Sequence, residues 1–327
     1  MITNRQQALN QELNNQGPGA RRPGEKGTDY MKDKQTIKRS AVRAAPIGLA
    51  GLAGTICAAA VALLLISGGF SAAWAITGGE VDQNNAYPNV GAVVALPPDS
   101  SGPTVMASGT LIHPRVLLTA GHVSIFMEQN PWTIPLTGVS FGTYALNPAT
   151  WHEVEAAITH PNYKYNPSGP CSQFANDVGV IILKEPIYDV PLAKLPCAGL
   201  LDDLKKAKLL REPGQGGVPF RVVGYGSTLE WPPKVLTPGD GWRRFADSKY
   251  LNVLPGWLHL LQNPATGNGG VAPGDSGGPV FCSEPDGARV LVAVTSWGEW
   301  VAMGSYWRVD LPETLDFIAQ VIQGLDD

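Results

Sequence analysis

Three glycines and a proline fall within six residues at positions 274–279, in the run Gly-Asp-Ser-Gly-Gly-Pro. Helices and strand interiors do not tolerate this density of glycine and proline, so the run predicts a tight turn. Small residues around Ser276 let backbone N–H groups approach a bound carbonyl group without hindrance from a Cβ atom. A serine in such a turn becomes a nucleophile when a base accepts its proton and donors stabilise the oxyanion. The rest of the chain must therefore supply a histidine and an acid.

Two upstream segments supply these groups. His122 follows the run Leu-Leu-Thr-Ala-Gly, and Asp177 precedes the run Val-Gly-Val-Ile-Ile-Leu. The order His, Asp, Ser, with spacings of 55 and 99 residues, resembles the chymotrypsin/trypsin-like family of serine proteases. The resemblance covers about residues 76–327 and implies a secreted member of bacterial type.

The resemblance also implies a role for each residue of the site. Ser276 would attack the scissile carbonyl, and His122 would accept the serine proton and return it to the leaving group. Asp177 would orient the imidazole ring and stabilise its charged form. The backbone N–H groups of Gly274 and Ser276 would form the oxyanion hole.

The expected fold is all-β: two six-stranded antiparallel β-barrels with a C-terminal α-helix, as the resemblance implies. The chain contains 38 Gly, 28 Pro and only 16% charged residues, and this composition also favours a loop-rich β protein. The peptidase domain would span residues 76–327, with barrels at about 76–195 and 215–327. Pro312 near the start of an apolar-periodic segment predicts the closing helix.

The resemblance places the substrate contacts at Gly270, Ser296, Trp297, Gly298 and Gly304. An acid at the position of Gly270 would select Lys or Arg at the cleaved bond. Glycine carries no charge, so the enzyme is not expected to require a basic residue there. Gly298 and Gly304 occupy the walls of this primary pocket, and their small size would leave room for an aromatic residue or Leu. Alternatively, Trp300 or Met303 fills the pocket, or Glu299 favours a basic residue from the rim.

The N-terminal quarter differs in character from the rest. Residues 1–75 hold 9 Lys and Arg against 4 Asp and Glu, whereas residues 76–327 hold 15 against 24. Residues 1–45 form a basic polar extension that we expect to be disordered, and translation starts at Met1 or Met31. Residues 46–75 contain no charge and end in Ala-Trp-Ala, as signal peptides do. The protein is then secreted, or an uncleaved segment anchors it in a membrane.

Cleavage after Ala75 would create a new N-terminus at Ile76. In the family that the chain resembles, such an amine pairs with the acid before the nucleophile, here Asp275. A buried carboxylate is costly without a partner, so the two charges need each other. Signal peptidase would then activate the enzyme directly. Cleavage after Ala73 is the alternative and would require further trimming.

The cysteine count leaves the disulfides open. Cys57 lies in the segment that cleavage would remove, and Cys171, Cys197 and Cys282 cannot all pair within one chain. Cys171 and Cys197 form one possible pair in an exported protein. Ala107 and Val123 occupy two places that a disulfide usually joins in the resembled family.

Composition also limits the partners. The acidic residues 76–327 argue against nucleic-acid binding, and no metal or cofactor motif is present. A protein or peptide substrate and a monomeric state are expected. A non-catalytic, protease-like binding module is the alternative. An esterase would need the order Ser, acid, His, which is the reverse of the order here.

Overall fold

Strands dominate the part of the chain that the computed structural model describes. This part comprises residues 76–97, 102–165, 174–211, 217–230, 235–283, 288–299 and 302–326. The expected extension at 1–45, the apolar segment at 46–75, Cys171 and Trp300 lie outside it.

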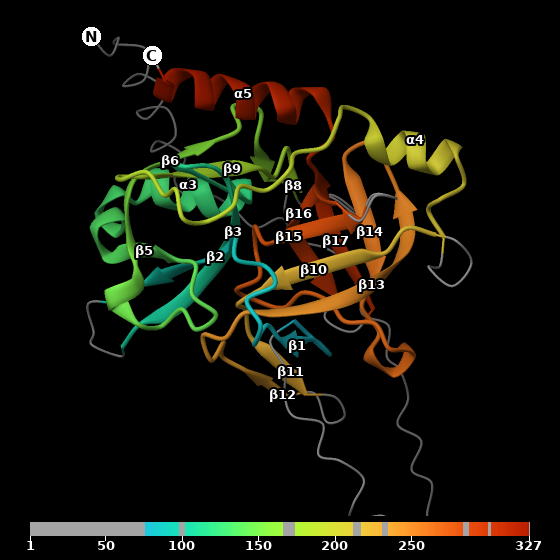
Figure 1. The fold of residues 1–327 in the computed structure, drawn as a ribbon, viewed down its shortest axis with the longest axis horizontal. Helices are drawn as coiled ribbons and strands as arrows, with labels where there is room; N and C mark the ends of the chain where they lie inside the picture. Colours follow the sequence, from blue (N-terminus) through green and yellow to red (C-terminus); the bar gives the residue numbers. More distant parts are fainter. Residues whose placement is uncertain are drawn as a thin grey trace, which may run out of the picture. The chain divides into compact units, whose positions relative to one another are not determined.

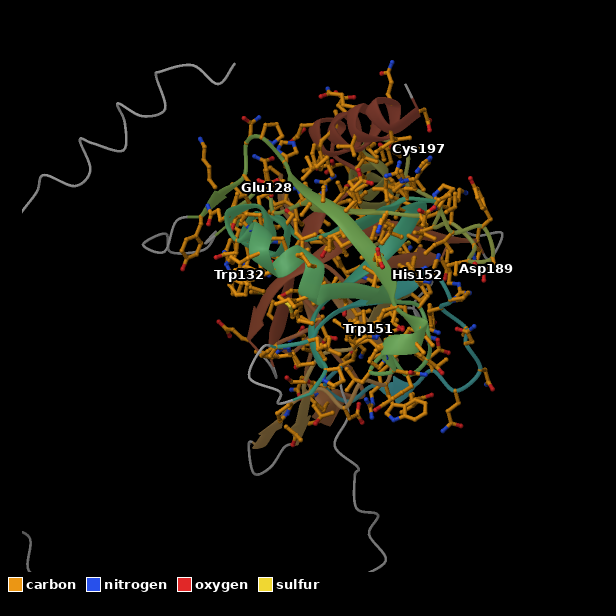
Figure 2. All side chains as sticks on the ribbon, turned by 90° about the vertical axis from the view of Figure 1, so that its left-hand side faces the viewer. Glu128, Trp132, Trp151, His152, Asp189 and Cys197 are labelled. Atoms are coloured by element: carbon orange, nitrogen blue, oxygen red, sulfur yellow. The ribbon has the colours of Figure 1, made fainter. Side chains whose placement is uncertain are left out.

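Six antiparallel strands close the first barrel (Figure 1), in the ring order β2-β3-β4-β9-β6-β5 with β5 paired to β2. The strands are β2 (Val90–Ala95), β3 (Thr104–His113), β4 (Val116–Thr119), β5 (Thr137–Ser140), β6 (His152–Thr159) and β9 (Gly179–Leu183). All of β9 is buried, because Ile181 and Leu183 pack into one core cluster while Val180 and Ile182 pack into another. Figure 2 shows this barrel from outside, with Glu128 on α3 and His152 on β6 labelled.

The second barrel closes in the order β13-β10-β15-β16-β17-β14, with β13 also paired to β14. Its strands are β10 (Phe220–Gly224), β13 (Arg244–Val253), β14 (Trp257–Leu261), β15 (Pro279–Ser283), β16 (Arg289–Glu299) and β17 (Met303–Arg308). The short strand β1 (Glu80–Val81) pairs with β13. Residues 76–81 therefore pack with the second barrel, although their place in the sequence groups them with the first.

The remaining elements connect or cover the barrels. They are the helices α3 (Gly121–Gln129), α4 (Leu200–Lys206) and α5 (Pro312–Asp326), the strand pairs β7 (Lys164–Tyr165) with β8 (Phe174–Ala175) and β11 (Thr228–Glu230) with β12 (Val235–Thr237), and the 3₁₀ turns η1 (Pro131–Leu136), η2 (Pro148–Thr150) and η4 (Pro264–Thr266). The expected architecture of two six-stranded barrels and a C-terminal helix is confirmed.

The closing helix α5 packs against both barrels. Phe317 and Ile318 are buried in a core cluster that also contains residues of the two barrels. His160, at the end of β6, lies with its Nε2 3.3 Å from the Glu313 carbonyl. Trp307 of the second barrel donates to Thr314 Oγ1 at 3.2 Å. The helix thus fixes the two barrels relative to each other.

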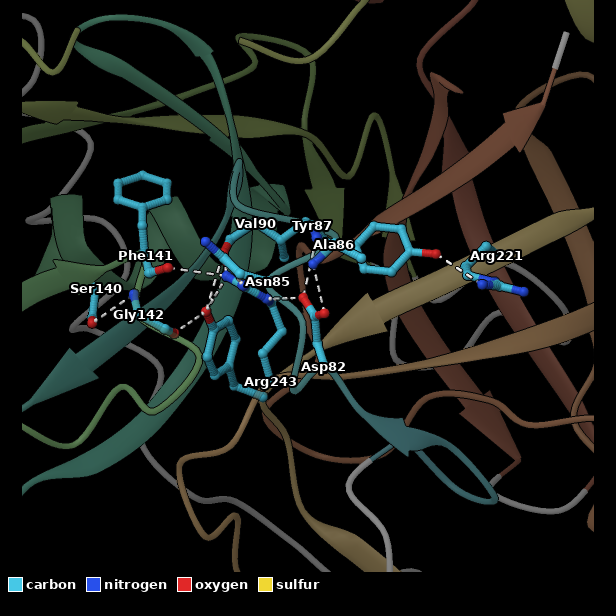
Figure 3. A network of polar contacts seen from close by, with 11 residues as sticks. Asp82, Asn85, Ala86, Tyr87, Val90, Ser140, Phe141, Gly142, Arg221 and Arg243 are labelled. Carbon is cyan, nitrogen blue, oxygen red and sulfur yellow. Dashed lines mark hydrogen bonds and ion pairs between the residues drawn. The ribbon is translucent and has the colours of Figure 1, made fainter. Parts of the chain in front are cut away.

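A buried arginine joins the same units on another side (Figure 3). Arg243 is fully buried, and its Nε donates to Asp82 Oδ2 at 2.8 Å. Its Nη1 donates to the carbonyls of Val90 and Phe141, at 3.1 and 3.0 Å, and lies 3.0 Å from the Tyr225 hydroxyl. One guanidinium therefore contacts the N-terminal segment and both barrels.

Candidate active site

His122 and Asp177 meet at the edge of the first barrel. His122 lies in the first turn of α3, directly after β4, and Asp177 precedes β9, the strand paired with β4. The His122 backbone N–H donates to Asp177 Oδ1 at 2.8 Å, and His122 Nδ1 lies 3.0 Å from Asp177 Oδ2. Because a carboxylate only accepts hydrogen bonds, Nδ1 carries the hydrogen and Nε2 is available as a base.

Asp177 is fully buried and receives a further hydrogen bond from the second barrel. The donor is the Oγ of Ser296, on β16. The sequence predicted Ser296 only as a substrate contact, and its side chain also holds the Asp177 carboxylate. The His122 side chain is 24% exposed, so its ring is partly accessible to solvent.

Aromatic rings cover one side of His122. The Phe174 ring stacks on the imidazole, with centroids 5.2 Å apart and an angle of 29°. Phe174 itself stacks with Tyr163 and Tyr165 through the β7–β8 hairpin. Sequence reasoning missed this cluster, because the loop before Asp177 has no periodic pattern.

The turn that carries Ser276 needs its glycines. Gly274 and Gly277 have φ values of +96° and +79°, a region that other residues rarely adopt. A Cβ on Gly277 would lie 2.0 Å from Thr119 Oγ1, so the first barrel approaches the turn closely. Ser108 of β3 holds the turn: its N–H donates to the Ser276 carbonyl at 2.9 Å and its hydroxyl donates to that of Gly274 at 3.1 Å. Sequence reasoning assigned no such role to Ser108.

The N–H groups predicted for the oxyanion hole are available. Within the described residues, the backbone N–H groups of Gly274 and Ser276 donate to no protein acceptor. The neighbouring N–H groups of Asp275 and Gly277 are used in the turn, at 3.0 Å to Ala272 and 2.8 Å to Thr295. Two unused donors therefore flank the side chain of the proposed nucleophile.

Asp275 is fully buried beside the N-terminal segment. Its carboxylate accepts hydrogen bonds from the backbone N–H groups of Gly226 at 2.8 Å, of Ala272 at 2.9 Å and of Ile76. Burial raises the pKa of Asp275 to about 7, although these donors and Arg244 act in the opposite direction. Ile76 is also fully buried and has a φ of +52°. The predicted activation pair is therefore in contact through the backbone.

A cavity of about 190 Å³ lies next to Ser276. Residues 271–273, Ser276 and residues 295–298 line it, so the predicted contacts Ser296, Trp297 and Gly298 face this space. The two other predicted contacts, Gly270 and Gly304, pack against the side chain of Gln262. The expected open space between the glycines is therefore occupied.

No group of three or more His, Cys, Asp or Glu side chains in the described residues is arranged to hold a metal ion. The same part of the chain contains no helix that is long and apolar enough to span a membrane.

A protein-family model described as Trypsin matches residues 76–315. The chain belongs to the trypsin family. The match covers both barrels and the first turn of α5, and it includes His122, Asp177 and Ser276.

Curated relatives of the trypsin family are similar over about 60% of this chain. Trypsin zeta of Drosophila erecta is 26% identical over 61% of the chain and 66% of its own length. Transmembrane protease serine 11C of Mus musculus is 29% identical over 61% of the chain and 44% of its own length. Inactive CLIP domain-containing serine protease A28 of Anopheles gambiae is 24% identical over 67% of the chain and 56% of its own length. The chain thus spans no more than two thirds of these trypsin-family relatives.

The cysteines of this trypsin-family chain form no disulfide within the described residues. Cys197 is an exposed thiol (Figure 2), and Cys171, its possible partner, lies outside the described residues. Cys282 is buried in β15, with its Sγ 3.8 Å from the Ser283 carbonyl.

Proposed function

We propose that this chain is a serine endopeptidase that hydrolyses peptide bonds through an acyl-enzyme intermediate on Ser276. The observation that carries the proposal is the contact between His122 Nδ1 and the buried Asp177 carboxylate at 3.0 Å, which leaves Nε2 to act as the base. His122 accepts the proton of Ser276 Oγ as the hydroxyl attacks the carbonyl carbon. The same proton then passes to the leaving amine, and a water molecule repeats the sequence to release the acid.

The oxyanion of each tetrahedral intermediate is stabilised by the backbone N–H groups of Gly274 and Ser276. Their lack of a protein acceptor within the described residues supports this role. Such donors lower the barrier because they are oriented before the charge develops. The substrate backbone pairs with residues 296–298, which line the cavity beside Ser276.

Cleavage after Ala75 activates the enzyme in this proposal. Ile76 has a φ of +52°, a region that a β-branched residue in an intact chain avoids. Cutting the preceding peptide bond removes the carbonyl group that causes this strain. The new ammonium group replaces an N–H donor with a full positive charge beside Asp275. Cleavage after Ala73, followed by trimming, leads to the same end state.

Secretion follows from the same cleavage, with residues 46–75 as the signal peptide. If the segment is not removed, the chain stays attached to a membrane and Ile76 remains in peptide linkage. N-terminal sequencing of the exported protein distinguishes these cases. A mature start at a residue other than Ile76 would contradict one-step activation.

A non-catalytic binding module is the second candidate, because one relative carries the name of an inactive serine protease. The test uses a fluorophosphonate probe, which labels only an activated serine, on protein that begins at Ile76. We expect labelling that disappears in Ser276→Ala and in His122→Ala. Ser283→Ala, outside the cavity, serves as the control and should label normally. Folded wild-type protein that is not labelled would favour the binding module.

A further inference from the structure

Gln262 occupies the space between the three glycines that were expected to leave the primary pocket open. It directly follows β14 and is fully buried. A Cβ added to Gly270 would lie 2.2 Å from Gln262 Cγ, and one added to Gly304 would lie 2.4 Å from its Oε1. A Cβ added to Gly298 would lie 3.2 Å from its Nε2. The glycines are thus small because the glutamine side chain packs against them.

Hydrogen bonds hold this side chain in place. The Val271 N–H donates to Gln262 Oε1 at 2.8 Å, and the Tyr306 hydroxyl donates to the same oxygen at 3.3 Å. The Gln262 backbone N–H donates to the Ala302 carbonyl at 3.0 Å. Moving the side chain would leave two buried donors without an acceptor, which is unfavourable. Gln262 is therefore a rigid part of the site.

The cavity beside Ser276 does not extend between Gly270 and Gly304, where the Gln262 side chain lies. Its lining consists of residues 271–273, Ser276 and residues 295–298, and it includes neither Gly270 nor Gly304. We infer that Gln262 is the floor of the primary specificity pocket and that it restricts the residue on the acyl side of the cleaved bond, P1, to small side chains such as Ala, Ser, Thr and Val. The inference rests on the proposed function, since it names the substrate class of the same site.

Two properties of the floor exclude other P1 residues. A large P1 side chain, aromatic or Leu, would need the volume that Gln262 fills. A basic P1 side chain would meet a neutral amide in place of a carboxylate, and its charge would be buried without compensation. In addition, the Gln262 Nε2 is buried and has no hydrogen-bond partner among the described residues.

The test measures kcat/KM on blocked tetrapeptide p-nitroanilides that differ only in P1: Ala, Val, Leu, Phe, Lys and Glu. The enzyme begins at Ile76, and its active fraction is titrated with the fluorophosphonate probe. We expect the wild-type enzyme to prefer Ala over Phe by about tenfold or more, since each methylene that a pocket accepts or rejects is worth about that factor. Gln262→Ala should shift the Phe-to-Ala ratio by about tenfold or more in favour of Phe.

Gln262→Met is the matched control, because methionine keeps the length of the side chain and should keep the preference for small P1 residues. A ratio measured within one preparation does not depend on how much of the enzyme is folded. A wild-type enzyme that prefers Phe, Leu or Lys overturns the inference by itself, even if Gln262→Ala fails to fold. An unchanged ratio in a folded Gln262→Ala also overturns it. Probe labelling without the expected profile contradicts only the floor, whereas absence of labelling contradicts the proposed function and the floor together.

Discussion

Asp82 and Asp275 are equally buried, but their charges are compensated in different ways. Asp82 is 1% exposed, and its carboxylate accepts from Arg243 Nε at 2.8 Å and from the backbone N–H groups of Ala86 and Tyr87 (Figure 3). Asp275 is 0% exposed, and its donors among the described residues are backbone N–H groups. Its pKa is raised to about 7 by burial.

The difference separates a carboxylate that accepts a hydrogen bond from a buried arginine from one that accepts only backbone hydrogen bonds among the described residues. Arg243 compensates the Asp82 charge within the folded chain. The intact chain offers Asp275 the N–H of Ile76, whereas a chain cut before Ile76 would offer an ammonium group. Four changes test this distinction, from the largest expected effect to the smallest.

Removing the arginine of the first pair should destabilise the folded protein. Arg243→Met leaves the Asp82 carboxylate buried without its cation, and we expect the free energy of unfolding to fall by about 3–5 kcal/mol. Urea denaturation followed by tryptophan fluorescence measures the change. Arg221→Met, which breaks an ion pair with Asp247 at the surface, is the control and should cost less than about 1 kcal/mol. Equal losses of unfolding free energy in the two variants would show that breaking the buried Asp82 pair costs no more than breaking the surface pair.

Neutralising the second aspartate should affect catalysis more than folding. In protein that begins at Ile76, Asp275→Asn removes the partner of the ammonium group and loosens the turn that carries the oxyanion donors. We expect kcat/KM to fall by about 100-fold, as when an oxyanion donor is lost. Peptide hydrolysis per mole of folded protein measures the effect. Full activity in this variant would contradict the proposed activation pair.

Before cleavage, Asp275 should make stability depend on pH. Its pKa is about 7 in the folded chain and 3.8 as the ordinary value, so the folded state binds more protons between these limits. Stability should therefore fall as the pH rises from about 4 to about 7, by about 2 kcal/mol between pH 5 and 7.

Thermal unfolding of a chain that begins at Ala73 measures this slope, since its Ile76 remains in peptide linkage. The same chain with Asp275→Asn should lose that part of the slope. Protein that begins at Ile76 should lose it too, because the ammonium group keeps Asp275 ionised. Identical slopes in all three proteins would contradict the unpaired state of Asp275.

The smallest expected effect concerns a third buried aspartate. Asp177 is held by His122 and by the Ser296 hydroxyl. Ser296→Ala removes one donor but leaves both contacts with His122, so we expect kcat to fall by about tenfold with little change in KM. Initial rates over a range of substrate concentrations separate the two constants. A change in KM alone would assign Ser296 to substrate binding rather than to positioning of Asp177.

The local motifs were enough to indicate the trypsin family and, through the resemblance, the fold class. A nucleophilic serine requires particular residue types around it, so the run at 274–279 is recognisable without a structure. The strand predicted at 257–261 and the helix starting at Pro312 also follow from local patterns, and both are present. The two-barrel architecture, implied by the resemblance, is confirmed.

Contacts between distant segments could not be predicted in this way. No sequence pattern indicates the stacking of Phe174 on His122, the bonds of Ser108 to the turn or the bond of Ser296 to Asp177. Each contact depends on which segments the fold brings together. The position of Gln262 against Gly270 and Gly304 could not be predicted for the same reason. Three glycines indicate space only if nothing else enters it, and Gln262 comes from the end of another strand.

The sequence by itself determined which side chains are available for the proposed chemistry, because a hydroxyl, an imidazole and a carboxylate have reactivities that no packing can replace. The tertiary structure decided what packs against Gly270 and Gly304 and what surrounds the Asp275 carboxylate. Both depend on burial, which removes water from a group and fills the volume around it, and burial is a property of segments brought together by the fold rather than of any one segment.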